Sequence, residues 1–255
     1  MPQVARPSLF SQISVEHGPA ALLGRVFLVC EAQLRERGVE LAFASLQDLV
    51  AVNQANSDSW KPLWSGFNPA FSHLTPENAF CILGYNRAGE VVATQAARFL
   101  DWPDTCYHAE AESLRLMYAD PEASKLPGER CKVTALAAKG ISGRVVYSGA
   151  AWYRSDFRGL GLVALLPRIS RALAYTRWDS DCTVSMMAPE VYKGGVLPRL
   201  GYRNIEWDIQ MFNSRGEIPR FALVWSKRAE MLEELREFLS SFDMSTDAAR
   251  RVVDG

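Results

Sequence analysis

The chain has 255 residues, of which 48% are hydrophobic and 22% are charged. That apolar fraction is ample for a folded core and excludes a disordered or collagen-like chain, while the length fits one large domain or two small ones. Lys and Arg (28) nearly balance Asp and Glu (29), for a formal net charge of −1. This balance argues against bulk attraction to nucleic acid or to an anionic membrane, so we expect neither as a partner.

Signals for export, membrane insertion and metal binding are also missing from the sequence. No apolar run approaches the roughly 18–20 residues that span a bilayer, and the first residues lack the charged-then-apolar order of a secretory signal. The three histidines show no metal-ligand spacing, and the five cysteines form no C-x-x-C pair. We therefore expect a reduced cytoplasmic protein without a metal site, whose buried thiols are Cys30, Cys81, Cys106, Cys131 and Cys182.

The first part of the chain predicts helix, strand, helix. Apolar residues recur at helical spacing over residues 20–37, with Pro19 placed to start that helix and Gly38 to end it. Residues 39–43 form a short β-rich run, and Ser45 is placed to cap a second helix.

Two β-rich runs follow an aromatic, proline-containing stretch. Residues 79–86 and 91–100 flank a short turn with Gly89 and predict a β-hairpin. Residues 101–143 hold one helical pattern and otherwise show no clear periodicity. Residues 144–153 predict the next strand, in which Gly149 marks a bulge or a close backbone approach.

From Gly161 the apolar period becomes helical and continues to Trp178. Pro167 lies inside this pattern and is expected to kink or restart the helix. Arg168, Arg171 and Arg177 fall off the apolar stripe and are expected at the solvent. Three further strands, a short helix opened by Pro189 and an amphipathic helix at residues 229–242 complete the prediction, and the last dozen residues are expected to be a loose tail.

The chemistry concentrates in the turn between the strand at 144–153 and this helix. Gly159 and Gly161 permit a tight turn directly before the first helical amides, which bind phosphates well because they are unpaired and sit at the positive end of the helix dipole. Arg154 and Arg158 would add charge-assisted bonds to the same anion. The Walker and dinucleotide patterns both fail here, since no G-K-S/T and no third glycine follows, and the two glycines alone also fit a simple turn.

The segment R-G-L-G-L at 158–162 resembles motif A of the GNAT superfamily, the acyl-CoA-dependent N-acyltransferases, whose pattern is R/Q-x-x-G-x-G/A. Arg158 fills its first position and Gly161 its fourth, but Val163 stands where Gly or Ala is usual. L-G-Y at 200–202 resembles the family's L-G-F signature. The resemblance implies an α/β fold with a mixed sheet, to which this chain adds an N-terminal helix and an insertion before the motif-A strand.

The same resemblance implies where acetyl-CoA binds. In the family, the motif-A strand splays away from the next strand and leaves a wedge, and the pantetheine arm pairs with its free backbone groups. That role falls to Ala151, Trp152 and Tyr153. The pyrophosphate would be held by the amides of Arg158, Gly159, Leu160, Gly161, Leu162 and Val163.

Acid and base are harder to assign. The family often places a tyrosine four residues before the glycine of L-G-F, and Leu197 stands there. Tyr192 is the candidate acid, with a packing role equally open. The candidate bases lie in the insertion, with solvated helix carboxylates as the alternative reading, and they are Glu110, Glu112 and His108.

We expect an N-acyltransferase that moves acetyl from acetyl-CoA to an amine of a small molecule or peptide. The alternatives are a non-catalytic acyl-CoA-binding or interaction module and a long-chain acyltransferase using a carrier protein. The domain prediction is a helical extension at 1–38, a GNAT-like domain at 39–227 with its insertion at about 101–143, and a C-terminal helix and tail at 228–255. That last helix either packs on the domain or forms the seam of a homodimer.

Overall fold

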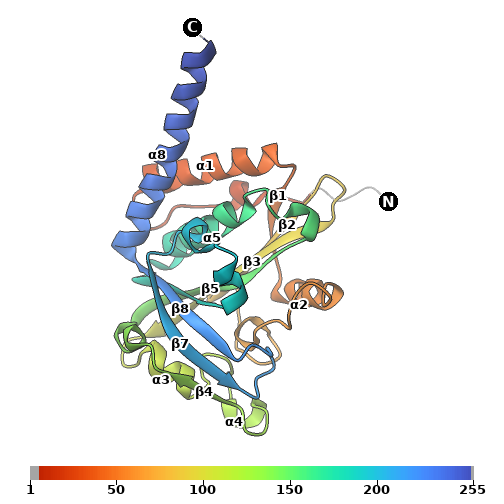
Figure 1. The fold of residues 1–255 in the computed structure, drawn as a ribbon, viewed down its shortest axis with the longest axis vertical. Coiled ribbons are helices and arrows are strands. Elements are labelled where there is room, and N and C mark those ends of the chain that lie inside the picture. Colours follow the sequence, from red (N-terminus) through yellow and green to blue (C-terminus); the bar gives the residue numbers. More distant parts are fainter. Residues whose placement is uncertain (1–5, 254–255) are drawn as a thin grey trace.

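One mixed sheet of eight strands organises residues 6–253, the part of the chain that the computed structural model describes (Figure 1). The strand order is β1-β2-β3-β5-β6-β8-β7-β4, and every neighbouring pair is antiparallel except β5 and β6. The strands are β1 (Glu40–Ala44), β2 (Ala79–Tyr85), β3 (Val91–Trp102), β4 (Arg130–Val133), β5 (Gly143–Tyr153), β6 (Cys182–Met187), β7 (Asn204–Phe212) and β8 (Arg220–Lys227).

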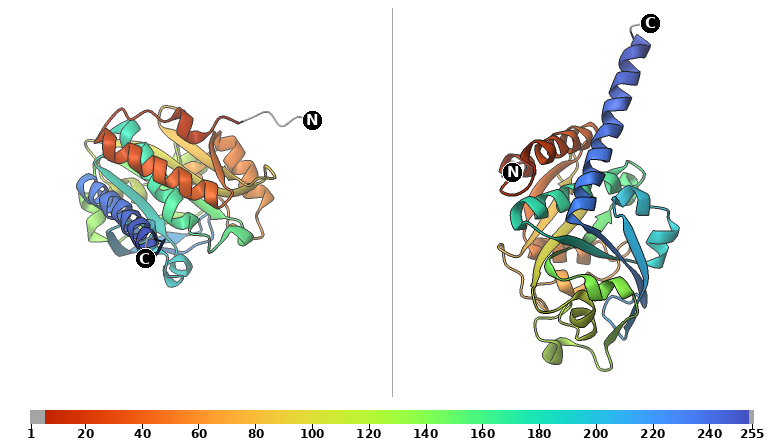
Figure 2. Two further views of the ribbon diagram at one scale, coloured as in Figure 1. Left: turned by 90° about the horizontal axis from the view of Figure 1, so that it is seen from above. Right: turned by 90° about the vertical axis from the view of Figure 1, so that its left-hand side faces the viewer.

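Three long helices gather on one face of the sheet (Figure 2). They are α1 (Ala20–Glu36), α5 (Leu162–Trp178) and α8 (Arg228–Val253). Helix α5 lies on β3 and β5, and α1 packs against both α5 and α8. Buried leucines, isoleucines and valines of α1, α5 and α8 meet in one cluster with residues from β1, β2, β3 and β5.

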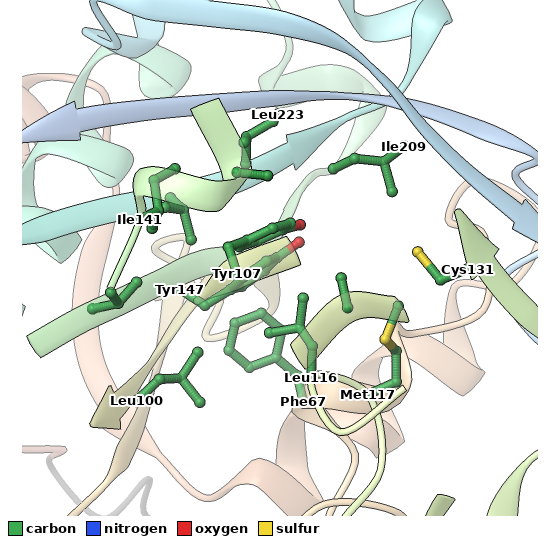
Figure 3. Packing of buried hydrophobic residues seen from close by; sticks show 14 of the residues in the cluster. Phe67, Leu100, Tyr107, Leu116, Met117, Cys131, Ile141, Tyr147, Ile209 and Leu223 are labelled. Atoms are coloured by element: carbon green, nitrogen blue, oxygen red, sulfur yellow. The ribbon is translucent and has the colours of Figure 1, made fainter. Parts of the chain in front are cut away.

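The opposite face carries shorter elements. They are α2 (Leu46–Ala55), the 3-10 turns η2 (Ser65–Phe67) and η3 (Leu136–Gly140), and α3 (Tyr107–Glu112). Their core is rich in aromatic side chains, with Phe67, Tyr107 and Tyr147 close together (Figure 3). The remaining short elements are η1 (Leu9–Gln12), α4 (Pro121–Ser124), η4 (Ser155–Phe157), α6 (Pro189–Lys193) and α7 (Leu197–Leu200).

The mixed α/β architecture predicted from the sequence is confirmed. The helix predicted at 20–37 is α1, and the predicted hairpin is β2 and β3. Ser45 caps α2, because its Oγ accepts a hydrogen bond from the amide of Asp48 at 3.0 Å while the Asp48 carboxylate accepts from the Ser45 amide. Helix α5 continues through Pro167 as one helix.

Two predictions on the helices are wrong. Arg168 and Arg171 were expected at the solvent but are buried, because α8 covers the face of α5 that carries them and supplies Glu234 as an ion partner. The loose tail is also wrong as far as Val253, since α8 continues to that residue. The sequence from 228 to 254 contains no glycine or proline to end the helix earlier. Residues 254–255 lie outside the described part of the chain.

The insertion at 101–143 belongs to the sheet and to its core. It contains α3, α4 and η3, and its strand β4 pairs with β7 to form the far edge of the sheet. Several of its residues, such as Tyr107 and Leu116, are fully buried in the aromatic-rich core. The domain boundaries given above stay a prediction.

Candidate functional site

Strands β5 and β6 are paired only where both begin. The parallel register covers residues 145–147 of β5 and 182–184 of β6. Beyond these residues β5 stays paired with β3 as far as Tyr153, and β6 stays paired with β8 as far as Met187. The two strands therefore part, and we call the space between residues 148–153 and residues 185–187 the β5–β6 wedge.

A tyrosine marks the apex of the β5–β6 wedge. Tyr147 is the last residue of β5 that pairs with β6, and its hydroxyl oxygen accepts a hydrogen bond from the amide of Met186 at 3.2 Å. The Tyr147 hydroxyl thus accepts the Met186 amide, which the β5 backbone would have paired had the two strands stayed together. The ring of Tyr147 stacks on Trp64 with centroids 4.3 Å apart.

The backbone of β5 is irregular directly beyond the apex. The register with β3 shifts between Thr94 and Ala96, and Ala150, opposite that shift, has a φ of 53°. The Thr94 hydroxyl donates to the Ala150 carbonyl at 2.7 Å and holds this bulge in place. A Cβ atom on Gly149 would lie only 3.0 Å from the ring of Phe67, so glycine fits the close approach that the sequence indicated.

The far end of the wedge leads into the glycine loop, residues 158–163. Gly159 and Gly161 have φ values of 81° and 79°, a region that glycine adopts without strain. Gly161 is the N-cap of α5 and provides no side chain to cap it. Within the described part of the chain, the amides of residues 159–163 donate no backbone hydrogen bond, whereas the next amide, of Ala164, donates to the Gly161 carbonyl. The loop therefore presents a row of unpaired donors at a helix N-terminus, as an anion site requires.

Arg37 supports this loop from a different element. It is the C-cap residue of α1, and its Nε donates to the Leu160 carbonyl at 2.6 Å. A Cβ atom on Gly161 would lie 3.9 Å from Nε and Nη2 of the same guanidinium. No local sequence pattern indicates this contact, because 123 residues separate the two partners.

The two arginines predicted at the loop have different surroundings. Arg154 forms ion pairs with Glu90 and Asp156, and these bonds raise its pKa and lower the pKa of both carboxylates. It therefore joins the β2–β3 turn to η4. Arg158 is exposed, and its Nε donates to the Tyr153 carbonyl at 3.0 Å. Arg158, the first residue of the glycine loop, thus joins the loop to the end of β5 and pairs with no carboxylate in the described chain.

The other face of the wedge is lined by aromatic rings from the segment 57–78. Trp60 stacks on Trp152 with centroids 5.7 Å apart, and the Trp152 indole donates to the Ser59 hydroxyl. The buried indole nitrogen of Trp64 has no hydrogen-bond partner. Through the contacts of Trp60 with Trp152 and of Trp64 with Tyr147, this segment forms an aromatic wall along β5.

The predicted acid and bases are not brought to the wedge by any contact that the structure shows. Tyr192 is 45% exposed on α6, and its ring packs edge-on against Trp207 of β7. Glu110 pairs with Arg115, which lowers the pKa of the carboxyl group, and also accepts from Thr105. Glu112 accepts from the Val133 amide and lies 3.7 Å from His108. The partners of both glutamates belong to the insertion.

Two cavities of the structure lie away from the β5–β6 wedge. One cavity of about 520 Å³ lies beside β1 and the N-terminal segment, and another of about 270 Å³ lies between α2 and the segment before β2. Neither is lined by the glycine loop or by β5. Among the side chains that the structure describes, those of residues 6–242, no group of three or more His, Cys, Asp or Glu is placed to hold a metal ion. No helix in the described part of the chain is long and apolar enough to cross a membrane.

Known proteins resemble this chain in structure and not in sequence. No protein-family model and no curated protein matches it. Similar solved structures include a spermidine N-acetyltransferase variant from Vibrio cholerae (9% identity, 77% of this chain and 97% of that one, TM-score 0.46). A second is the aminoglycoside acetyltransferase AAC(6')-Ib with coenzyme A and kanamycin (12% identity, 75% of this chain and 96% of that one, TM-score 0.44). A third is RimJ of Mycobacterium smegmatis with CoA-disulfide (13% identity, 78% of this chain and 88% of that one, TM-score 0.43). Because these TM-scores lie below 0.5, the function proposed next rests on the site itself.

Proposed function

We propose that the chain is an acyl-CoA-dependent N-acyltransferase that moves an acyl group, acetyl in the simplest case, to an amine of a small molecule or peptide. The observation that carries the proposal is the β5–β6 wedge leading directly into a glycine loop in which the amides of residues 159–163 donate no backbone hydrogen bond. In this arrangement the amides of residues 159–163 would hold the pyrophosphate of CoA, whereas the predicted Arg158 amide already donates to the Ser155 carbonyl. The free edge of β5 at residues 151–153 would pair with the pantetheine arm.

The reaction needs no metal and balances as a simple acyl transfer. The neutral amine attacks the thioester carbonyl, so that a C–N bond forms and the C–S bond breaks. The proton lost by the amine goes to a base, and the departing thiolate takes a proton from an acid. Backbone amides of the irregular stretch of β5 beside Ala150 would polarise the carbonyl oxygen.

Calorimetry with acetyl-CoA, followed by a thiol-release assay over a broad panel of amines, tests the proposal. Binding together with thiol release on at least one amine supports the enzyme. Binding without release from acetyl-CoA or longer acyl donors would favour the alternative, a non-catalytic acyl-CoA-binding module. Release only from acyl carrier protein would favour the long-chain alternative. If no CoA species binds, the proposal is wrong.

Tyr192 is the proposed acid, supported by its exposure on α6 and by the lack of a tyrosine at position 197. Tyr192→Phe keeps the ring and its packing on Trp207 and removes only the hydroxyl. We expect kcat to fall about 10²-fold or more with little change in the KM for acetyl-CoA. Unchanged turnover would exclude Tyr192 and leave the acid to be found elsewhere.

Buried thiols support a reducing compartment as part of the proposal. Cys30, Cys81, Cys131 and Cys182 are all buried and unpaired. Burial raises the pKa of Cys30, Cys131 and Cys182 to about 12, so these thiols are poor nucleophiles. We therefore place the enzyme in the cytoplasm and give none of these cysteines a catalytic role.

A further inference from the structure

A buried charge cluster lies between α5, α8 and the L-G-Y segment, on the helix face of the sheet. Arg168 and Arg171 of α5 approach Glu234 of α8, and Tyr202 lies beside them with the guanidinium carbon of Arg171 4.6 Å from its ring centre. The exposed fractions are 6% for Arg168, 0% for Arg171 and 6% for Glu234. We call these four residues the Arg171 cluster.

Arg168 and Arg171 differ strongly in their hydrogen bonds. Arg168 donates to Glu234, to the Ala164 carbonyl and to the Arg199 carbonyl. None of the three nitrogens of Arg171 has an acceptor in hydrogen-bond geometry, and its nearest carboxylate oxygen, Glu234 Oε2, is 3.7 Å away. Its other polar neighbour is Tyr202, through the ring and the hydroxyl group. A fully buried guanidinium without hydrogen bonds is costly, because its desolvation is not offset by donated bonds.

The cluster also carries more positive than negative charge. Two arginines face one glutamate, and the neighbouring Cys30 thiol is neutral at pH 7 because burial raises its pKa to about 12. One cation therefore lacks a counter-charge. The group that would complete such a site is an anion, and a carboxylate matches the planar fork of a guanidinium better than a single-point acceptor does.

The cluster lies against the apex of the β5–β6 wedge. The Tyr202 hydroxyl interacts with both Arg171 and Ser148, and Ser148 is the first residue of β5 beyond its last pair with β6. The hydroxyl of Ser170, the residue before Arg171, is 3.4 Å from that of Ser148. Arg171 is thus joined to the apex both through Tyr202 and through its own helix.

Its distance from the glycine loop excludes a role toward the pyrophosphate. At a rise of 1.5 Å per residue, Arg171 lies roughly 14 Å along α5 from Leu162. An extended pantetheine arm reaches over a comparable length and ends at the thioester. A CoA ester held at the loop and along β5 would therefore deliver its acyl group, and not its phosphates, near the cluster. The acceptor amine is a poor occupant, since an ammonium would be repelled by the excess positive charge of two arginines that share one glutamate.

We propose that Arg171 receives the carboxylate of an acyl group that ends in one, so that the preferred acyl donors are CoA monothioesters of dicarboxylic acids, such as succinyl-CoA. This inference rests on the proposed function and extends it from acetyl to a class of acyl group. The acyl carboxylate would give Arg171 a counter-charge that it does not share with Arg168, together with acceptors for its guanidinium nitrogens.

The test compares succinyl-CoA with butyryl-CoA, which has the same number of acyl carbons and no terminal carboxylate. By calorimetry on the full-length wild-type protein we expect succinyl-CoA to bind at least about tenfold more tightly, since a charge-assisted pair in a buried site has that effect. Equal affinities would overturn the inference and leave the Arg171 cluster a purely structural feature. This comparison needs no variant, so it holds even where a substitution fails to fold.

A pair of variants tests whether Arg171 causes the preference for succinyl-CoA over butyryl-CoA. Arg171→Met should abolish it by weakening succinyl-CoA binding at least tenfold while butyryl-CoA binds as before. Arg177→Met, on the same helix but bonded to the Pro76 carbonyl instead, should keep the full preference. A preference that survives Arg171→Met would also overturn the inference. Absence of binding by every CoA species is a different result, because it removes the proposed function itself.

Discussion

At the residue scale, the candidate site depends on backbone that only glycine supplies. Gly161 is the N-cap of α5 with a φ of 79°, and the space at Gly159 is open, with no atom within 4 Å of where a Cβ would lie. Because neither glycine has a side chain, the loop amides stay uncovered and space remains beside them for a ligand. Leu160 between them is 41% exposed, so the loop faces the solvent and not the core.

Gly161→Asp should abolish binding of CoA, because its carboxylate would stand against the pyrophosphate at the same amides. Gly161→Asn is the matched control, since asparagine has nearly the same shape, lacks the charge and is among the side chains best tolerated at positive φ. We expect Asn to weaken binding several-fold and Asp to weaken it at least about 100-fold, as measured by calorimetry with acetyl-CoA. Equal effects of the two substitutions would mean that the loop does not hold an anion.

At the element scale, α1 is part of the site although it precedes β1 and lies outside the motif. Its C-cap residue Arg37 donates to the Leu160 carbonyl and is held by the carbonyl and side chain of Gln33. Helix α1 therefore fixes the conformation of a loop that follows it by more than a hundred residues. The guanidinium also adds a positive charge beside the amides of the loop.

Arg37→Gln should weaken acetyl-CoA binding by about 5- to 30-fold, since it removes one hydrogen bond that orders the loop and one charge near the phosphate. Arg35→Gln is the control, because Arg35 lies on the same helix, is exposed and pairs with Glu31 at its own surface. Calorimetry at low and at high salt separates the two effects, as the charge contribution is screened by salt. If both variants bind like the wild type, Arg37 has no part in the site.

The elements that the sequence predicted are those with strong local signals. Apolar periodicity located α1 and α5, the short turn located the β2–β3 hairpin, and two glycines before a helix located the loop. Contacts made across the fold had no such signal. Arg171 has the sequence appearance of a surface residue, and only the packing of α8 on α5 buries it. Residues 101–143 were unreadable because their short elements, among them the four-residue strand β4, take their shape from the sheet edge.

At the scale of the whole molecule, α8 closes the structure over α5. Its first half packs into the core on the helix face, where Met231, Leu235 and Leu239 are buried, and its second half extends beyond the body of the protein (Figure 1). Glu234 lies in the packed half and is the ion partner of both buried arginines of α5. The last helix of the chain is thereby fastened to the helix whose N-terminus forms the candidate phosphate site.

Glu234→Gln should lower the free energy of unfolding by about 3–5 kcal/mol, because it leaves two buried guanidinium groups without a carboxylate. Glu233→Gln is the matched control: Glu233 is the preceding residue of α8 and is exposed, so we expect a change below about 0.5 kcal/mol. Urea unfolding of the two variants and the wild type, followed by circular dichroism, measures both values. A loss below about 1 kcal/mol in Glu234→Gln would show that the arginines find other partners when α8 cannot neutralise them. The attachment of α8 to α5 would then be apolar, through Leu235 and its neighbours, and not ionic.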